Sequence, residues 1–326
     1  MMIRNKMLAV DFVKEFSDVT GGIKGSAANR TKQLLEQWQL ENSRNITQDL
    51  TLAINDRIED QWSWFLNLPN CTMRNSKEGN PWGLCEAPEG LGKLKLMVLG
   101  NSYTASHGKL IMEYLRPHYS KLFFHSVITC EFLRTTAEYE VCTHTHAQHW
   151  ASIKAEKPDV VFVLQRWISP NLAVEGCNIS SDPLFEIIKN VEKLEQKVSK
   201  VIILQALPRV ADPRSAIQKR LKEHKELDDV MQETIDTVAE PLRERLVQVA
   251  KICKKCILFD VYKRHLNKDG KFMVIHPHTH IQFFERARHH NPYGWRLIAP
   301  VYEKLSLNFN RLMKSDVTYP ENLLEW

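Results

Sequence analysis

The chain has 326 residues, 44 basic and 39 acidic side chains, and seven cysteines. Its hydrophobic (43%), aromatic (9%) and charged (25%) fractions are those of a globular protein, which excludes disorder, collagen and coiled coil as descriptions of the whole chain. The net charge of +5 is the small difference of two interspersed populations, with no basic stripe interleaved with aromatics, so nucleic acid is not an expected partner. We find no run of 18 apolar residues and no apolar h-region near Met1, and therefore predict neither a transmembrane segment nor a signal peptide.

The first 92 residues show little strand pattern. Residues 31–67 carry apolar side chains at helical spacing, which predicts two amphipathic helices that pack on another element. Residues 70–85 are rich in Gly, Pro and Asn and have a cysteine at each end, which favours a loop. We treat residues 1–92 as a helical N-terminal extension with a Cys-bracketed loop.

From residue 93 onwards, short apolar runs alternate with helical patterns. Strands are predicted at 94–99, 121–128, 160–164, 201–206 and 256–261. Helices are predicted between residue 102 and 119, and at 147–157, 183–198, 214–251 and 293–313. This alternation is typical of βαβ units and a mainly parallel sheet, and it assigns residues 93–326 to one α/β domain.

Ser102 follows the first of these strands, in the sequence Gly100-Asn101-Ser102. Gly permits a sharp turn, and a helix that begins at the serine would direct free N–H groups at a developing oxyanion. The plainer interpretation is that Ser102 only caps the helix, because serine is a preferred N-cap.

His289 lies just before the last predicted helix, in a segment that can fold back over the end of the first strand. A serine nucleophile needs a base within hydrogen-bond reach. The early Ser102 and the late His289 are therefore more informative together than either is alone.

The residues Lys95 to Ser102 resemble the first block of the SGNH hydrolase superfamily, whose usual form is Gly-Asp-Ser. His289, followed five residues later by Gly294, resembles its last block, Asp-x-x-His-x-x-x-x-Gly. The stretches 70–71, 81–85 and 157–166 are similar to the branch fused to multi-pass membrane O-acyltransferases of the acyltransferase-three type. The likeness covers about residues 70–313. It implies a three-layer, SGNH-hydrolase-like (flavodoxin-like) α/β fold, with Ser102 as nucleophile and His289 as base.

Two positions depart from the family pattern. Asn101 replaces the usual Asp of the serine block, and Arg286 stands three residues before His289, where the family carries its triad Asp. Glu285 is next to that position, but neighbouring residues of an extended segment point to opposite sides unless a loop re-aims them. We therefore expect a Ser–His dyad, with Asn101 and Glu285 as supporting candidates. Gln165 is the candidate side-chain donor to an oxyanion, its alternative being a solvated polar residue at a strand end.

The resemblance also implies a lumenal or extracellular location. In that setting Cys71 with Cys85, and Cys130 with Cys142, would suit two disulfides, the alternative being reduced, buried thiols. The remaining cysteines, Cys177, Cys253 and Cys256, are left over, and we interpret Cys253-x-x-Cys256 as structural. Glycosylation candidates are provided by four sequons, at Asn29, Asn45, Asn70 and Asn178.

Two histidine clusters offer a rival interpretation. Histidines 144, 146 and 149, and histidines 276, 278 and 280, have spacings that metal ligands use. No carboxylate-rich or cysteine ligand set accompanies them, so we expect no metal and no other cofactor.

The leading hypothesis is an extracytoplasmic, membrane-associated domain that transfers an O-acyl (acetyl) group, or hydrolyses an ester, on a glycan or lipid-linked substrate. Its expected partner is a multi-pass membrane acyltransferase domain that this chain does not contain. The alternative is a catalytically degenerate SGNH-like binding module, because Arg286 occupies the position of the triad Asp.

Overall fold

The computed structural model describes residues 48–60, 65–74, 81–135, 139–167, 183–223, 225, 227, 230, 235–237, 239–286, 288–314 and 323–325. A mixed sheet of eight strands runs through these described residues, in the order β1-β2-β4-β3-β5-β6-β9-β10. Every neighbouring pair from β4 to β10 is parallel, whereas β1–β2 and β2–β4 are antiparallel. The predicted α/β class with a mainly parallel sheet is confirmed.

The strands of this sheet are β1 (Thr72–Met73), β2 (Gly83–Glu86), β3 (Leu94–Gly100), β4 (Tyr119–Ser126), β5 (Val160–Val163), β6 (Lys200–Leu204), β9 (Cys256–Asp260) and β10 (Leu323–Glu325). The α-helices are α3 (Gln48–Asp60), α5 (Ser102–Tyr114), α6 (Thr145–Glu156), α7 (Pro183–Glu195), α8 (Pro213–Lys222), α10 (Glu240–Ile252) and α11 (Pro292–Lys314). A small ladder pairs β7 (Arg209–Val210) with β8 (Ile235–Thr237), and two 3-10 turns are η1 (Glu140–Cys142) and η3 (Tyr262–His265).

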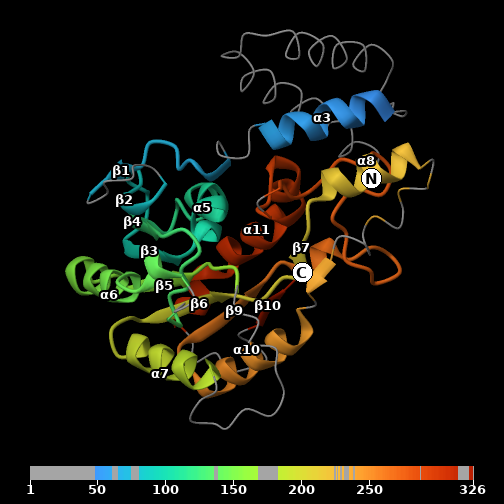
Figure 1. The fold of residues 1–326 in the computed structure, drawn as a ribbon. Helices are drawn as coiled ribbons and strands as arrows, with labels where there is room; N and C mark the ends of the chain where they lie inside the picture. Colours follow the sequence, from blue (N-terminus) through green and yellow to red (C-terminus); the bar gives the residue numbers. More distant parts are fainter. Residues whose placement is uncertain are drawn as a thin grey trace.

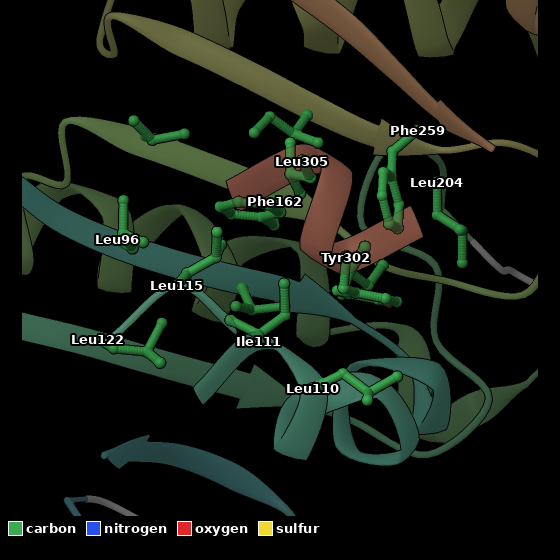
Figure 2. Close-up of a cluster of buried hydrophobic side chains, with 14 of the residues drawn as sticks. Leu96, Leu110, Ile111, Leu115, Leu122, Phe162, Leu204, Phe259, Tyr302 and Leu305 are labelled. Atoms are coloured by element: carbon green, nitrogen blue, oxygen red, sulfur yellow. The ribbon is translucent and has the colours of Figure 1, made fainter. Parts of the chain in front are cut away.

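Helices cover both faces of the sheet, which gives three layers (Figure 1). Successive residues of a strand point to opposite faces, so a strand buried on both sides is apolar throughout. In β3, Leu96 and Val98 pack with α5 and α11 on one face. Met97 and Leu99 pack with α6, α7 and α10 on the other. Figure 2 shows the first face, where Ile111 of α5, Leu115 just after α5, and Tyr302 and Leu305 of α11 meet the strand side chains.

The structure differs from the sequence predictions at three elements. Residues 70–85 are not all loop, because β1 and β2 add an antiparallel edge to β4. The predicted helix 214–251 is interrupted, since α8 ends at Lys222, β8 pairs with β7, and α10 begins at Glu240 with Pro241 in its first turn. Proline there starts a helix and does not continue one. The strand β10 lies outside the predicted set, in a segment of only three residues.

Two helices are predicted within residues 31–67, and the structure describes α3 and residues 65–67 of this range. Residues 1–47 and 61–64 lie outside the described part of the chain. Within the described residues, no helix combines the length and the apolar character that a membrane crossing requires.

Candidate active site

Ser102 is the first residue of α5 and directly follows the carboxyl end of β3. The chain turns there at Gly100, whose φ of +143° and close approach to Leu164 exclude a side chain: an added Cβ would lie 2.6 Å from the Leu164 carbonyl oxygen. Ser102 is partly exposed between buried neighbours. At the first position of a helix its N–H has no partner within the helix.

His289 lies in the segment that enters α11. Asn291 fixes this segment, because its Oδ1 accepts the N–H groups of Tyr293 (2.9 Å) and Gly294 (3.1 Å) and its own N–H donates to the Phe283 carbonyl (3.1 Å). Gly294 is needed for close packing, since an added Cβ would lie 2.3 Å from that same carbonyl oxygen. The helix start thus holds His289 at a fixed distance from residue 283.

Ser102, His289 and Glu285 form one continuous hydrogen-bonded line. The Oγ atom of Ser102 is 2.7 Å from Nε2 of His289, and Nδ1 of His289 is 2.5 Å from Oε1 of Glu285. The side chain of Glu285 is fully buried and that of His289 is 7% exposed. A carboxylate accepts only, so Nδ1 carries the proton, and Nε2 of the neutral ring accepts from the serine hydroxyl.

A tight turn aims Glu285 at His289. Oε1 of Glu285 also accepts the His289 N–H (2.9 Å), and the Glu285 N–H donates to the His289 carbonyl (3.0 Å). Arg288 has a φ of +75°, and its carbonyl accepts a hydrogen bond from the Tyr103 hydroxyl (3.0 Å). The carboxyl group that contacts His289 therefore lies four residues before it, and not three as in the family pattern.

Arg286, which occupies the family's acid position, has an exposed side chain. The carboxylate that meets the imidazole is that of Glu285.

Asn101 joins the ends of two strands. Its Oδ1 accepts the N–H groups of Tyr103 (3.2 Å) and Arg166 (2.9 Å), and its Nδ2 donates to the Arg166 carbonyl (2.7 Å). The side chain is fully buried. An aspartate could accept these two bonds but could not donate the third, which accounts for asparagine at this position.

Gln165 is buried (1% exposed) at the end of β5, and its Cβ lies close to Gly100. Its Oε1 accepts the Phe132 N–H at 2.7 Å. Among the described residues, its Nε2 is a buried donor with no hydrogen-bond partner. A buried amide donor that is left unsatisfied beside a strand end is suited to a developing negative charge.

Three disulfides lie within the described part of the chain: Cys71–Cys85, Cys130–Cys142 and Cys253–Cys256. Both proposed pairs are present. The expectation that Cys253 and Cys256 are left over is wrong, because the end of α10 and the start of β9 bring their Cα atoms to 5.4 Å. Cys177 lies outside the described residues, as do the sequons at Asn29, Asn45 and Asn178, whereas Asn70 is exposed.

The two histidine clusters are not arranged as metal sites. In the described part of the chain, no group of three or more His, Cys, Asp or Glu side chains is placed to hold a metal ion. Nδ1 of His276 instead accepts the N–H groups of His278 and Thr279, and His146 accepts from the Trp150 indole.

Three buried histidines beside the candidate site form a hydrogen-bonded chain that their spacing in the sequence does not predict. Nδ1 of His265 is 3.1 Å from the Met273 carbonyl, so it must donate, and its Nε2 then accepts from His290 (3.0 Å). By the same logic His107 donates to His290 (3.1 Å) and accepts from the Tyr302 hydroxyl (2.5 Å). Burial lowers the pKa of His107 to about 3, that of His265 to about 4 and that of His290 well below its usual value. One carbonyl thus sets the tautomers of three neutral histidines.

A protein-family model described as "SGNH domain (fused to AT3 domains)" matches residues 70–304, more than two thirds of the chain. No curated protein matches this chain.

Several solved structures are similar in part. The periplasmic domain of a lipopolysaccharide acetyltransferase from Salmonella ser. Paratyphi A is 16% identical, with a TM-score of 0.48, covering 69% of this chain and 85% of that one. A GDSL-like lipase from Bacteroides thetaiotaomicron is 14% identical, with a TM-score of 0.39, covering 66% and 88%. A catalytic mutant of an acetylxylan esterase from Geobacillus stearothermophilus is 11% identical, with a TM-score of 0.35, covering 69% and 95%.

Proposed function

Because the chain belongs to the family of SGNH domains fused to AT3 domains, we propose that it transfers an O-acyl (acetyl) group, or hydrolyses an ester, on a glycan or lipid-linked substrate. The observation that carries this proposal is the hydrogen-bonded line from Ser102 through His289 to Glu285. A partly exposed hydroxyl, a base in contact with it and a buried carboxylate behind the base are the parts that nucleophilic acyl transfer needs.

In the first half of the reaction, Ser102 Oγ attacks the acyl carbonyl while Nε2 of His289 takes the hydroxyl proton. Glu285 holds the ring in the tautomer that leaves Nε2 free to accept, and its charge stabilises the imidazolium that forms. The tetrahedral intermediate then collapses, the bond to the leaving oxygen breaks, and His289 returns the proton to that oxygen.

In the second half, His289 takes a proton from water or from a sugar hydroxyl as that oxygen attacks the acyl-serine. Water gives ester hydrolysis, and a sugar hydroxyl gives transfer. Ser102 leaves with the proton that His289 carries, which restores the starting state.

We assign the oxyanion to two donors, the N–H of Ser102 and Nε2 of Gln165. The first lies at the N-terminus of α5, where the helix dipole favours negative charge. The second is oriented by the bond that its Oε1 accepts from Phe132. A single donor of this kind is worth roughly 10²–10³ in rate.

We further propose a lumenal or extracellular location and a multi-pass membrane acyltransferase as the partner. Three disulfides in the described residues suit an oxidising compartment, and the exposed Asn70 is accessible to glycosylation. The partner follows from the family, whose description names fusion to AT3 domains.

The alternative of a degenerate binding module depended on the loss of the acid at Arg286. The contact between Glu285 and His289 removes that argument, and we favour the enzyme.

Labelling with a fluorophosphonate probe, which reacts with activated serines, tests the proposal. We expect the wild-type chain to be labelled and Ser102→Ala to remain unlabelled. No labelling of folded wild-type protein at high probe concentration, or equal labelling of both proteins, would overturn the catalytic role of Ser102.

A further inference from the structure

The helix α3 precedes the residues that the family model matches, yet it buries a row of polar side chains. Thr51, Asn55 and Glu59 follow one another at intervals of four residues, so they lie on one face of the helix. They are only 4%, 1% and 2% exposed. Burying an amide and a carboxylate is unfavourable unless each is hydrogen-bonded, so their partners are informative.

All three side chains bond to one segment, residues 279–286. Thr51 donates to the Thr279 carbonyl (2.7 Å), and Asn55 donates to the His280 carbonyl (3.1 Å) and accepts the Gln282 N–H (3.0 Å). Glu59 accepts from the Gln282 side chain and from the Arg286 N–H (2.9 Å). In Figure 1, α3 lies near α8 and α11.

The last of these bonds reaches the candidate site. The Arg286 N–H and the Glu285 carbonyl belong to the same peptide unit, so Glu59 fixes the backbone directly behind Glu285. Glu285 in turn contacts both the N–H and the ring of His289. A line of hydrogen bonds thus runs from α3 through the backbone of residues 285–286 to the proposed base.

We propose that Glu59, with Asn55, is a positioning residue for the proposed acyl transfer: through residues 282–286 it sets where Glu285 stands against His289. The inference rests on the proposed function of Ser102. It makes α3 part of the active-site structure.

The chemistry of Glu59 distinguishes two substitutions. Alanine removes both acceptors and leaves the Arg286 N–H and the Gln282 amide without them. Glutamine keeps one oxygen for the Arg286 N–H. Its amide can donate to Oε1 of Gln282, a buried acceptor that lacks a partner among the described residues, once the Gln282 amide group turns over from the orientation in which its Nε2 faces residue 59. Glu59→Gln therefore preserves the connection and removes only the charge.

The test measures labelling by the fluorophosphonate probe over a range of concentrations, which separates the maximal rate from the half-saturating concentration. For Glu59→Ala we expect the maximal rate to fall about 10- to 100-fold, because a displacement of about 1 Å is sufficient for such a loss. The half-saturating concentration should stay the same. Glu59→Gln should stay within about threefold of wild type.

A matched control lies one turn earlier on the same helix. Asp56 pairs with Arg214 (2.7 Å) and is 46% exposed, so Asp56→Ala should label at the wild-type rate. Each rate is measured well below the midpoint of thermal unfolding. A merely structural role would lower that midpoint and the labelled fraction without slowing the labelled molecules.

The inference is overturned if folded Glu59→Ala labels at the wild-type rate, or if Glu59→Gln is as slow as Glu59→Ala. If Glu59→Ala does not fold, Asn55→Ala takes its place with the same expectations. Failure of the proposed function would be recognised separately. In that case the probe would not label the wild-type chain, or it would label Ser102→Ala equally well.

Discussion

At the residue scale, the turn before α11 has one residue more between Glu285, whose carboxyl group contacts the ring, and His289 than the family pattern has between its acid and its histidine. The left-handed conformation of Arg288 and the bond from Tyr103 to its carbonyl hold this wider turn. The carboxylate of Glu285 consequently caps the His289 N–H and contacts the ring with the same oxygen. The neighbouring residue, Arg286, is exposed.

Two neighbouring substitutions test which residue is the acid. Glu285→Gln keeps the shape of the side chain but removes the charge that orients and stabilises the imidazolium. We expect the labelling rate of Ser102 to fall on the order of 10²–10⁴-fold. Arg286→Ala, which removes an exposed side chain and keeps the backbone N–H, should label within about threefold of wild type. The reverse order of effects would contradict the assignment to Glu285.

At the element scale, buried side chains tie together the carboxyl ends of the strands. Asn101 joins the end of β3 to the residues after β5, and Gln165 joins β5 to the segment after β4. Asp260, at the end of β9, pairs with Arg243 of α10 and accepts the Tyr262 N–H (2.8 Å). The edge that carries Ser102 is therefore held by specific polar contacts as well as by the apolar core.

Asn101→Asp tests this bridge. The substitution restores the usual residue of the family, yet it places a charge in a fully buried site and removes the donor to the Arg166 carbonyl. We expect the free energy of unfolding to fall by roughly 1–3 kcal/mol. Denaturant unfolding at neutral pH measures this. A variant as stable as wild type would show that the hydrogen bond from Asn101 to the Arg166 carbonyl contributes little to the free energy of unfolding.

The disulfides give a chemical prediction at the same scale. The chain has seven cysteines and six of them are paired in the structure. A thiol reagent should therefore titrate about one group under denaturing, non-reducing conditions, and seven after reduction. Protein from an oxidising expression compartment is the sample to use, and a count of seven before reduction would refute the disulfides.

At the scale of the whole molecule, the buried histidines make stability depend on pH. Unfolded histidine binds a proton near its usual pKa of about 6.5, whereas burial lowers the pKa of His107 to about 3 and that of His265 to about 4. Between these limits the unfolded chain binds more protons, so stability decreases as pH falls. Glu59 acts in the opposite sense, because burial raises its pKa to about 7. Burial also lowers the pKa of His290, so three histidines act against the single carboxyl group of Glu59.

We therefore expect the free energy of unfolding to fall by several kcal/mol between about pH 6.5 and pH 4, at roughly 1–3 kcal/mol for each buried histidine. Unfolding measured at intervals across this range gives the slope. His144→Ala, at an exposed histidine, should leave the slope unchanged. A flat profile would contradict neutral, hydrogen-bonded histidines in the core.

The sequence predicted the sheet class well because each core strand is a short apolar run that ends in polar or glycine residues, as at Gly100-Asn101. Ser102 and His289 could be selected by their places relative to helices, since Ser102 begins the helix after β3 and His289 lies three residues before α11. The helix prediction over 214–251 failed because its charged residues suit a helix everywhere, and only Pro241 signalled a new start.

Other features were beyond sequence reasoning because they depend on contacts between distant segments. In an extended strand, a residue next to the expected acid position would point away from His289. The turn around Arg288 instead brings the side chain of Glu285 into contact with the His289 ring. Asn55 and Glu59 did carry a signal, as polar residues beside Ile54 and Ile58 on a buried helix face. Their partners, 223 to 227 residues away, could not be inferred from that signal.

The sequence separations of these hydrogen bonds are much larger than those of the disulfides. This difference affects the order in which the two kinds of bond can form during synthesis. The three disulfides join cysteines 14, 12 and 3 residues apart, so each can close soon after its segment emerges from the ribosome. The bonds of α3 to residues 279–286 must wait for residues that follow 223 to 228 positions later in the chain. Until those residues have been synthesised, α3 lacks the segment to which its buried polar side chains bond. A nascent chain could hence close each of these cross-links before the candidate site, which includes residues 285 and 289, is complete.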